Sequence, residues 1–227
     1  MRCLWVSKER DGAVMMKKEF STRPEAISEQ YCKDCYCSWQ GFVTGMPSLV
    51  FVVTGWKKNG RENACLNSWA TFRNDGPDGF VWVMPANKGG HMYKSLKKTG
   101  VCVLNFPSND IYDRCVKTIG NNQWEADEIT AAGLTAEPAA KVNAPRIKEC
   151  FLNIECKFLW ERKGFVAVKA VHICMDSDRY DQSKLGRYGK TGYLYQIDQA
   201  TNPETGEISP FGPGIIEQGD FVPWTTK

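Results

Sequence analysis

The 227-residue chain has no long hydrophobic run and no excess of charge of one sign. No apolar run approaches the roughly 18 residues that a membrane-spanning helix needs, and the apolar segment after Arg2 is too short for a signal peptide. Its 29 basic residues are interspersed with 26 acidic ones, for a net charge of +3. Such a distribution favours neither nucleic acid nor an anionic membrane as a partner. We therefore expect a cytoplasmic protein that binds neither.

Histidine is also scarce, and only His91 and His172 are available as imidazole ligands. The ten cysteines should stay as thiols in a chain without an export signal. Cys32, Cys35 and Cys37 form a cluster that could bind zinc or exchange thiols, but a second C-x-x-C and a nearby fourth ligand are missing. Cys35 also falls on an apolar helical stripe, where cysteine is an ordinary packing residue. We expect no metal site.

A dinucleotide-binding signature is missing too, because no G-x-G-x-x-G segment follows a predicted strand. This excludes a Rossmann-type nicotinamide site. The chain does have enough apolar material for one substantial core, with 42% hydrophobic and 12% aromatic residues. We expect a single domain over residues 1–227, with a core at about 40–176 and a C-terminal extension at about 177–227. An extension of that length should serve as a lid or as an arm on a partner subunit.

β-strand signals dominate the chain. Apolar alternation and β-branched runs predict strands at 48–54, 80–84, 101–106, 150–160, 165–173 and 192–197, and one that contains 63–69 and ends near 73. Asn59-Gly60 and Lys163-Gly164 read as hairpin turns. Capping residues and apolar faces predict helices at 22–37, 91–96, 108–120 and 125–132. This order predicts a mainly β fold, an antiparallel barrel with peripheral helices, rather than a parallel α/β fold.

Two segments concentrate polar groups that could bind a ligand. Residues 63–69, NACLNSW, spread two amides and a hydroxyl through a predicted strand, where they could meet the hydrogen-bonding edge of a flat heteroaromatic ring. Residues 87–90, NKGG, lead into the helix that begins at His91. A helix N-terminus offers free N–H groups and a positive dipole end, and Lys88 and His91 add cationic side chains, which together suit a phosphate monoester. Each segment alone is a weak signal.

Several ordered stretches of the chain resemble the flavin reductase-like FMN-binding split barrels, and among them the flavoredoxin-like branch. Residues 60–69, GRENACLNSW, are similar to the family pattern G-x-x-N-A-M-T-x-x-W, and residues 99–107, TGVCVLNFP, to F-x-V-N-x-P. GLT at 133–135 and APRIKECFLNIEC at 144–156 extend the resemblance, which runs from about 47 to 176. The resemblance implies an FMN-binding split barrel, antiparallel, with FMN at a homodimer interface.

The resemblance also implies which residues bind the flavin. The strand at 63–69 would line its ring, and the loop at 87–93 would hold its phosphate. In this family a threonine usually stands at Leu66 and a hydroxyl residue at Met92, so both hydrogen bonds are lost here. FMN affinity could therefore be lower, or the flavin could be a loosely held substrate. The implied cofactor-binding residues are Asn63, Cys65, Leu66, Asn67, Ser68, Trp69, Asn87, Lys88, His91, Met92 and Asn105.

Three functions stay open at this point. The first is an FMN-dependent oxidoreductase that passes a hydride from transiently bound NAD(P)H to the flavin, and on to a redox acceptor protein or small molecule, without a catalytic acid or base. The second is a flavoredoxin-type electron carrier with no strong NAD(P)H activity. The third is a non-flavin binding module, or a thiol metalloprotein built on Cys32, Cys35 and Cys37. A homodimer is expected from the resemblance and from the aromatic C-terminal extension.

Overall fold

The structure is a computed structural model that describes residues 7–10, 13–25, 27, 38–120, 123–180, 192–198 and 211–216. The chain divides into two compact units, Met1–Met46 with Asp198–Pro210 and Pro47–Ile197 with Phe211–Lys227. The described elements of the first unit are a hairpin and one helix: β1 (Ser7–Arg10), β2 (Ala13–Met16) and α2 (Trp39–Thr44). The second unit holds the large sheet and the pocket.

Little of the helix expected at 22–37 can be compared with the structure. Residues 26 and 28–37 lie outside the described part of the chain, and so do Cys32, Cys35 and Cys37. Residues 22–25 are irregular, and the amide of Ile27 donates to the carbonyl of Pro24 at 3.1 Å. Pro24 therefore lies in a turn, and the described residues 22–25 are not helical.

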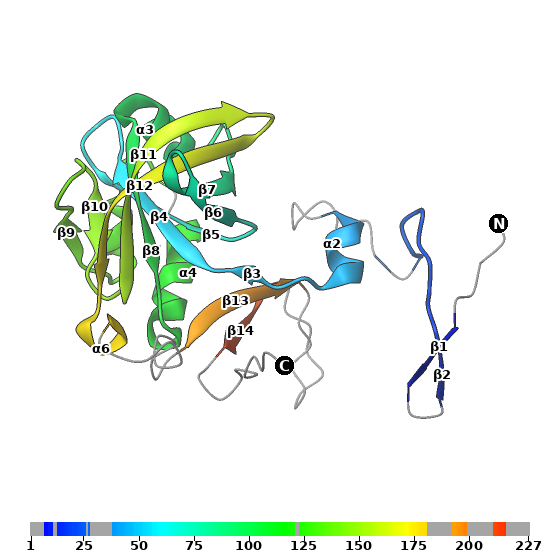
Figure 1. Ribbon diagram of the computed structural model, residues 1–227. Helices are drawn as coiled ribbons and strands as arrows, with labels where there is room; N and C mark the ends of the chain where they lie inside the picture. The colour runs from blue at the N-terminus through cyan, green and yellow to red at the C-terminus, as the bar shows by residue number, and fades with distance from the viewer. Residues whose placement is uncertain are drawn as a thin grey trace. The chain divides into compact units, whose positions relative to one another are not determined.

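A seven-stranded antiparallel sheet forms the body of the second unit (Figure 1). Its strands pair in the order β5-β4-β8-β11-β12-β7-β6. They are β4 (Phe51–Trp56), β5 (Glu62–Asn67), β6 (Thr71–Gly76), β7 (Gly79–Pro85), β8 (Val101–Phe106), β11 (Leu152–Arg162) and β12 (Phe165–Met175).

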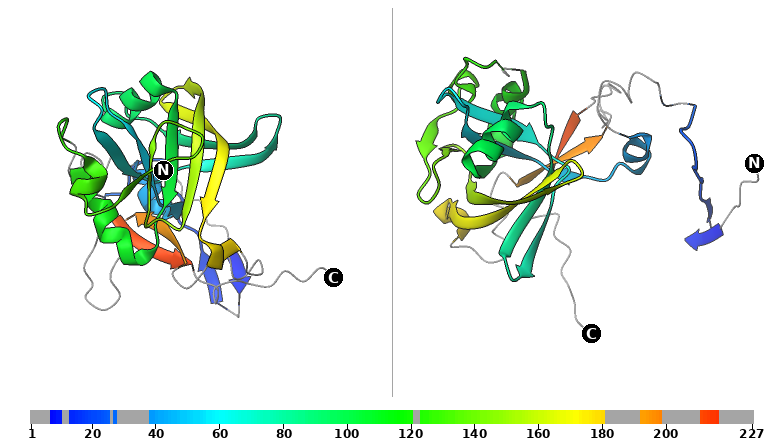
Figure 2. Two further views of the ribbon diagram at one scale, coloured as in Figure 1. Left: turned by 90° about the vertical axis from the view of Figure 1, so that its left-hand side faces the viewer. Right: turned by 90° about the horizontal axis from the view of Figure 1, so that it is seen from above.

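The two edge strands of this sheet, β5 and β6, are consecutive in the chain and separated only by residues 68–70. In a flat sheet of seven strands the edges would lie about 29 Å apart, at about 4.8 Å per strand. A connection of three residues spans at most roughly 14 Å. The sheet must therefore curl toward closure, as Figures 1 and 2 show. Because β5 and β6 do not pair, it is a split antiparallel barrel, and the fold expected from the sequence is confirmed.

Local turn chemistry places the hairpins where the sequence predicts them. Gly60, at φ 82°, turns β4 into β5, and Lys163 and Gly164, at φ 48° and 84°, turn β11 into β12. Positive φ at both Lys163 and Gly164 matches the right-handed twist of the strands that they connect. One strand differs from its prediction. The strand expected to run from 63–69 to about 73 is broken at Trp69, which adopts φ 54°, and β6 begins as a separate strand.

The barrel interior is filled by large apolar side chains. Phe51 and Trp82 meet edge to face with their ring centroids 5.1 Å apart, and both are buried. The first half of β11 is buried on both faces, so the polar side chains that alternate with its apolar ones are buried as well. Glu155 accepts hydrogen bonds from the amides of Ala140 and Lys141, at 2.7 and 2.6 Å. A buried carboxylate is tolerated there because these amides satisfy it.

Helices pack against β4 and β5 outside the barrel. They are α3 (His91–Thr99), the 3₁₀ turn η1 (Asn109–Ile111), α4 (Tyr112–Gly120) and α5 (Glu128–Ala131). Gly100, at φ 70°, ends α3 as predicted. Ile111, Cys115 and Ile129 form a second apolar cluster with Val52 and Ala64. The helix expected at 125–132 is shorter than predicted, because residues 123–127 form a turn and α5 begins only at Glu128.

The remaining described elements are short. β9 (Ala136–Pro138) pairs with β10 (Pro145–Ile147), and α6 (Ser177–Tyr180) follows β12. A three-stranded sheet contains β3 (Ser48–Leu49), β13 (Tyr193–Asp198) and β14 (Phe211–Ile216). The strand predicted at 192–197 is thereby confirmed. In the described part of the chain, no helix is both long and apolar enough to cross a membrane.

Candidate functional site

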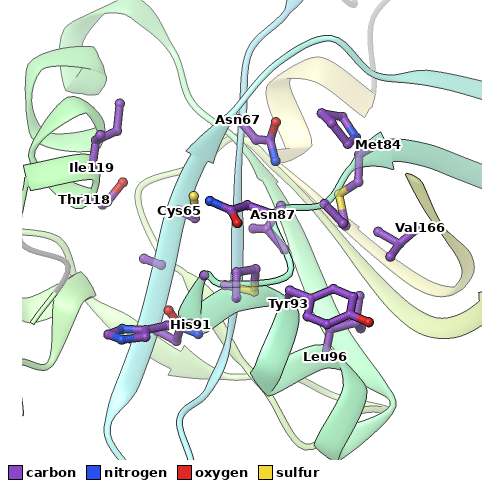
Figure 3. Close-up of a pocket in the computed structure, with 17 residues that line it drawn as sticks. Cys65, Asn67, Met84, Asn87, His91, Tyr93, Leu96, Thr118, Ile119 and Val166 are labelled. Atoms are coloured by element: carbon purple, nitrogen blue, oxygen red, sulfur yellow. The ribbon is translucent and has the colours of Figure 1, made fainter. Parts of the chain in front are cut away.

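A cavity of about 200 Å³ opens where β5, the end of β7, α3 and α4 meet (Figure 3). Cys65 and Asn67 project from β5, Met84 from β7, His91 and Tyr93 from α3, and Thr118 and Ile119 from α4. The remaining lining residues are Val53, Asn63, Ala64, Pro85, Ala86, Asn87, Gly90, Met92, Leu96 and Val166. The cavity thus brings together the two polar segments, 63–69 and 87–93, that the sequence analysis singles out.

The β5 wall carries three polar side chains because strand residues alternate between two faces. Asn63, Cys65 and Asn67 all line the cavity, whereas Leu66 packs into the apolar cluster beneath α4. Asn63 is almost fully buried, and its Nδ2 donates to Ser95 Oγ at 2.7 Å. That bond ties β5 to α3. Cys65 and Asn67 are only half-buried and are therefore the side chains of this wall that a ligand can reach.

The loop before α3 folds into a compact turn. Asn87 accepts two hydrogen bonds. The amide of Gly89 donates to its side-chain Oδ1 at 3.0 Å, and the amide of Gly90 donates to its backbone carbonyl at 2.9 Å. A Cβ at Gly90 would lie 3.2 Å from that carbonyl, tighter than most real contacts, so glycine suits the turn. Within the described residues no side chain caps α3. Its first-turn amides and its positive dipole end therefore remain available to an anion at the cavity.

A buried ion pair lies behind β5. Lys57 and Glu128 are almost fully buried, with Lys57 Nζ 2.8 Å from Glu128 Oε1. Lys57 Nζ also donates to the carbonyls of Gln123 and Ala126, each at 2.7 Å, so all three of its N–H groups are engaged. Glu128 Oε2 accepts from the amide of Ala64 at 2.7 Å. The pair thus fastens β5 to the segment that leads into α5.

Glu128 also faces two side chains of the cavity. Burial, and secondarily the negative charge of Glu128, raise the pKa of Cys65 to about 11, so the thiol is protonated at neutral pH and is no nucleophile. His91 Nδ1 lies 3.7 Å from Glu128 Oε1, too far for a hydrogen bond. Among the described residues this buried nitrogen has no hydrogen-bond partner. The rings of His91 and Trp124 meet edge to face, with their centroids 5.1 Å apart.

A second charged cluster holds α3 to the β11–β12 hairpin. Glu161 pairs with Lys88 Nζ at 2.9 Å and accepts from the Tyr93 hydroxyl at 2.7 Å, and Lys97 Nζ lies 3.4 Å away. The hydrogen bonds from Lys88 and then from Tyr93 lower the pKa of Glu161 from its ordinary value of 4.5 to about 2. Lys88, a sequence candidate for phosphate binding, is therefore paired with Glu161 and does not line the cavity.

Glu161→Gln should change the acid dependence of stability. Because the pKa of Glu161 is lowered on folding, its contribution is fully present above about pH 5 and is lost as the pH falls through 4.5 toward about 2. We expect the urea midpoint of the wild-type protein to exceed that of the variant by a constant amount at pH 6–8. The two midpoints should approach each other as the pH falls from about 4.5 toward 2. A difference that persists undiminished at pH 2 would contradict the assignment.

Three further sequence candidates lie near the cavity without lining it. The Leu66 side chain is in the apolar cluster, and its amide donates to Thr118 Oγ1 at 3.1 Å. Ser68 is buried, and its hydroxyl contacts Gln196 Oε1 at 2.6 Å. Trp69 is 41% exposed, and its amide donates to Ser48 Oγ. Ser68 and Trp69 thus fasten the end of β5 to β13 and β3.

Asn105 lies away from the cavity, fully buried at the centre of the sheet. Its Nδ2 donates to the carbonyl of Val52 and to Thr54 Oγ1, both at 2.9 Å. Its Oδ1 accepts from the Ile147 amide and from Asn153 Nδ2, also at 2.9 Å. This side chain joins β4, β8, β10 and β11, and its polar groups are engaged within the protein.

The contribution of α4 to the cavity does not follow from the helix predicted at 108–120. Its apolar periodicity groups Ile119 with Ile111 and Cys115, yet Ile119 is 56% exposed and lines the cavity, whereas the other two are in the core. Thr118 supplies a hydroxyl that donates to the Cys115 carbonyl at 2.7 Å. The apolar cavity walls from β7 and β12 are missed as well, because their residues read as ordinary core positions.

The geometry agrees with a family comparison. The model of the flavin reductase like domain family matches residues 43–195. The chain belongs to this family. The family resemblance stated from the sequence is thus confirmed, and the match takes in all the strands of the barrel.

Two relatives and several solved structures are similar to this chain. An uncharacterized protein of Methanothermobacter thermautotrophicus is 30% identical over 95 residues, which cover 38% of this chain and 45% of the relative. One of Aquifex aeolicus is 31% identical over 127 residues, or 52% of this chain and 62% of the relative. The chain therefore spans about half the length of these relatives.

The structural neighbours share the fold. The flavoredoxin of Desulfovibrio vulgaris (Miyazaki F) superposes with a TM-score of 0.62 at 17% identity, covering 89% of this chain and 97% of its own. Nitrilotriacetate monooxygenase component B from Bacillus cereus has a TM-score of 0.63 at 17% identity, and the match covers 86% of this chain and 97% of that protein. The flavoredoxin from Methanosarcina acetivorans has a TM-score of 0.62 at 18% identity, and the match covers 80% of this chain and 90% of that protein. At such identities these neighbours show the split-barrel fold.

Proposed function

We propose that this protein binds FMN in the cavity between β5, β7, α3 and α4 and acts as an oxidoreductase. The observation that carries the proposal is the juxtaposition of a polar strand face with an uncapped helix N-terminus in one cavity. A flat ring needs hydrogen-bonding groups along one edge, and its phosphate needs N–H groups and positive charge. Membership of the flavin reductase-like family supports the same ligand.

The proposed binding residues form a smaller set than the sequence alone implies. Cys65, Asn67 and Asn87 would lie along the ring, and His91, with the first-turn amides of α3, would hold the phosphate. When bound, FMN supplies the hydride-accepting chemistry. The described residues lining the cavity include no carboxylate, and Cys65 is a neutral thiol. The protein would then act by positioning its reactants.

The size of the cavity bears on how a hydride donor would approach. About 200 Å³ is less than the roughly 300–1,000 Å³ of pockets that enclose a whole cofactor. A flavin seated there would keep part of its ring exposed. An open face is what a transiently bound NAD(P)H requires, because the chain has no Rossmann signature of its own. We therefore propose hydride transfer from NAD(P)H to FMN, and onward to a redox acceptor protein or small molecule.

Fluorescence titration with FMN, followed by stopped-flow mixing with NADH or NADPH, tests this function. FMN fluorescence should change saturably, and absorbance near 450 nm should bleach rapidly after mixing. Cys65→Phe should abolish binding by filling the cavity, whereas the matched Cys65→Ser variant should retain it. If wild-type FMN fluorescence and protein melting temperature stay constant at saturating FMN, the proposal is wrong.

A flavoredoxin-type electron carrier is the second candidate, because two flavoredoxins are among the structural neighbours. FMN would then bind as above, but NADH and NADPH would leave it oxidised, and only a protein or chemical reductant would bleach it.

A thiol metalloprotein has less support. Among the described residues no group of three or more His, Cys, Asp or Glu could hold a metal ion, and the cysteine cluster at 32–37 is not among them.

A homodimer is also proposed, on the grounds of exposed apolar side chains. Trp69, Phe72 and Ile173 are 41%, 53% and 54% exposed, and large exposed apolar groups are typical of an interface. Light scattering should give twice the chain mass of 25.6 kDa, and the monomer mass at micromolar concentration would contradict the proposal.

The six described cysteines are all free thiols, which favours a reducing compartment. We propose that the protein is cytoplasmic, and cell fractionation tests this.

A further inference from the structure

The proposed function uses His91 to hold the phosphate, but it does not use the position of His91 beside Glu128. His91 is the first residue of α3, its side chain is 19% exposed, and it lines the cavity. Its Nδ1 is buried, has no hydrogen-bond partner among the described residues, and lies 3.7 Å from Glu128 Oε1. The two N–H directions of an imidazole diverge, so a protonated ring with Nδ1 toward Glu128 would direct Nε2 elsewhere. A protonated ring could therefore face Glu128 on one side and an anion on the other.

The charged groups around His91 come from several elements. Glu128 of α5 is the nearest, and the same carboxylate oxygen is already paired with Lys57 from the β4–β5 turn. The segment before α5 presents the uncharged ring of Trp124. Its acidic residues turn elsewhere, with Asp127 paired to Arg61 Nη1 at 2.6 Å and Glu125 beside Asn59 Nδ2 at 3.5 Å.

The other walls add no fixed charge to this balance. α4 contributes Thr118 and Ile119 to the cavity, and β5 contributes the neutral thiol of Cys65. On α3 itself Lys94 lies one turn further along. The groups around His91 thus include a positive helix end and Lys57 on one side and a single carboxylate, Glu128, on the other. An anion placed at the helix end would add a second negative group beside the imidazole.

We propose that the buried Lys57–Glu128 pair positions His91 as a proton-linked anion receptor, so that binding of a phosphate monoester at the start of α3 draws a proton onto His91. The inference rests on the proposed function, since the phosphate is that of FMN. The imidazolium would donate through Nε2 to the phosphate and lie against Glu128 through Nδ1. Glu128 is here a positioning residue that acts through His91, and it also fixes the β5 wall through the Ala64 amide. One proton leaves water or buffer and forms the second N–H bond of the imidazole, and no bond between heavy atoms changes.

Isothermal titration calorimetry with FMN in buffers of different ionisation enthalpy tests the proposal. The slope of binding enthalpy against buffer ionisation enthalpy gives the protons exchanged. At pH 7.5 a phosphate monoester, with its second pKa at about 6, is already dianionic, and a positive helix end favours that dianion, so proton uptake on binding would come from the protein. We expect the wild-type protein to take up about half a proton or more per FMN. Riboflavin, which lacks the phosphate, should bind without proton uptake.

Three variants separate this role from a structural one. His91→Gln should abolish proton uptake and weaken FMN about tenfold, while its affinity for riboflavin stays within twofold. His172→Gln is the matched control, since His172 lies on β12 opposite Glu155, and it should keep full uptake. Glu128→Gln keeps an acceptor for Ala64 but removes the charge, and uptake should fall below half. Equal uptake by the wild-type and His91→Gln proteins would overturn the inference while leaving the function intact. Failure of the wild-type protein to bind FMN would overturn both.

Discussion

Replacing Lys57 by methionine is expected to lower the free energy of unfolding by about 3–5 kcal/mol. The substitution leaves the carboxylate of Glu128 buried without its cation, and it also removes the donor to the carbonyls of Gln123 and Ala126. Methionine fits the space of the lysine stem, so the loss would come from the charge and not from a cavity. Urea unfolding at pH 7, followed by tryptophan fluorescence, measures it.

Two controls make that result specific. Lys58 is the exposed neighbour of Lys57, and Lys58→Met should change the free energy of unfolding by less than about 0.5 kcal/mol. The double variant Lys57→Met/Glu128→Gln removes both charges and leaves an acceptor for the amide of Ala64. It should recover more than half of the loss, because the stranded charge is the main cost. A loss below about 1 kcal/mol in the single variant would contradict a buried ion pair between Lys57 and Glu128.

The ion pair shows why sequence alone predicts the fold better than the site. Residue 57 reads as a surface lysine because it precedes an Asn-Gly turn, and nothing local connects it to Glu128. Hairpins, helix ends and strand alternation depend on residues close together in the chain. Gly60 and Lys163 with Gly164 correctly predict two hairpin turns, and Gly100 correctly predicts the end of α3. The partner of a charged side chain depends on how strands and helices meet across the fold. Lys88 illustrates the same limit, since its pairing with Glu161 depends on the β11–β12 hairpin reaching α3.

The two polar segments were found from sequence because each is continuous in the chain. Asn63, Cys65 and Asn67 follow from strand alternation, and His91 follows from the helix start. Strand alternation does not predict the positions of Ser68 and Trp69. The chain breaks after β5, so Ser68 bonds to β13 and Trp69 bonds to β3. Thr118 and Ile119 come from a helix predicted only to cover the barrel. A single apolar periodicity cannot separate a residue that lies in the core from one at the rim of a cavity.

Asn105→Leu is expected to lower the free energy of unfolding by about 3–5 kcal/mol, because it leaves several buried partners unsatisfied at about 1–3 kcal/mol each. The Ile147 amide and Asn153 Nδ2 would lose their acceptor, and the Val52 carbonyl would lose a donor. Leucine matches asparagine in size, so the barrel should still assemble. Chemical denaturation measures the loss, and Asn109→Leu, at an exposed site, should cost less than about 0.5 kcal/mol.

Flavin affinity separates this structural role from the ligand contact that the family pattern implies for Asn105. The folded Asn105→Leu protein should bind FMN with a dissociation constant within about twofold of wild type, because Asn105 does not line the cavity. Asn67→Leu should do the reverse, weakening FMN about tenfold by removing an amide from the cavity wall while changing stability little. If Asn105→Leu instead kept its stability and lost FMN, Asn105 would have to leave its hydrogen-bond partners to reach the ligand. The four strands that it joins would then be held together by their backbone ladders and apolar contacts alone.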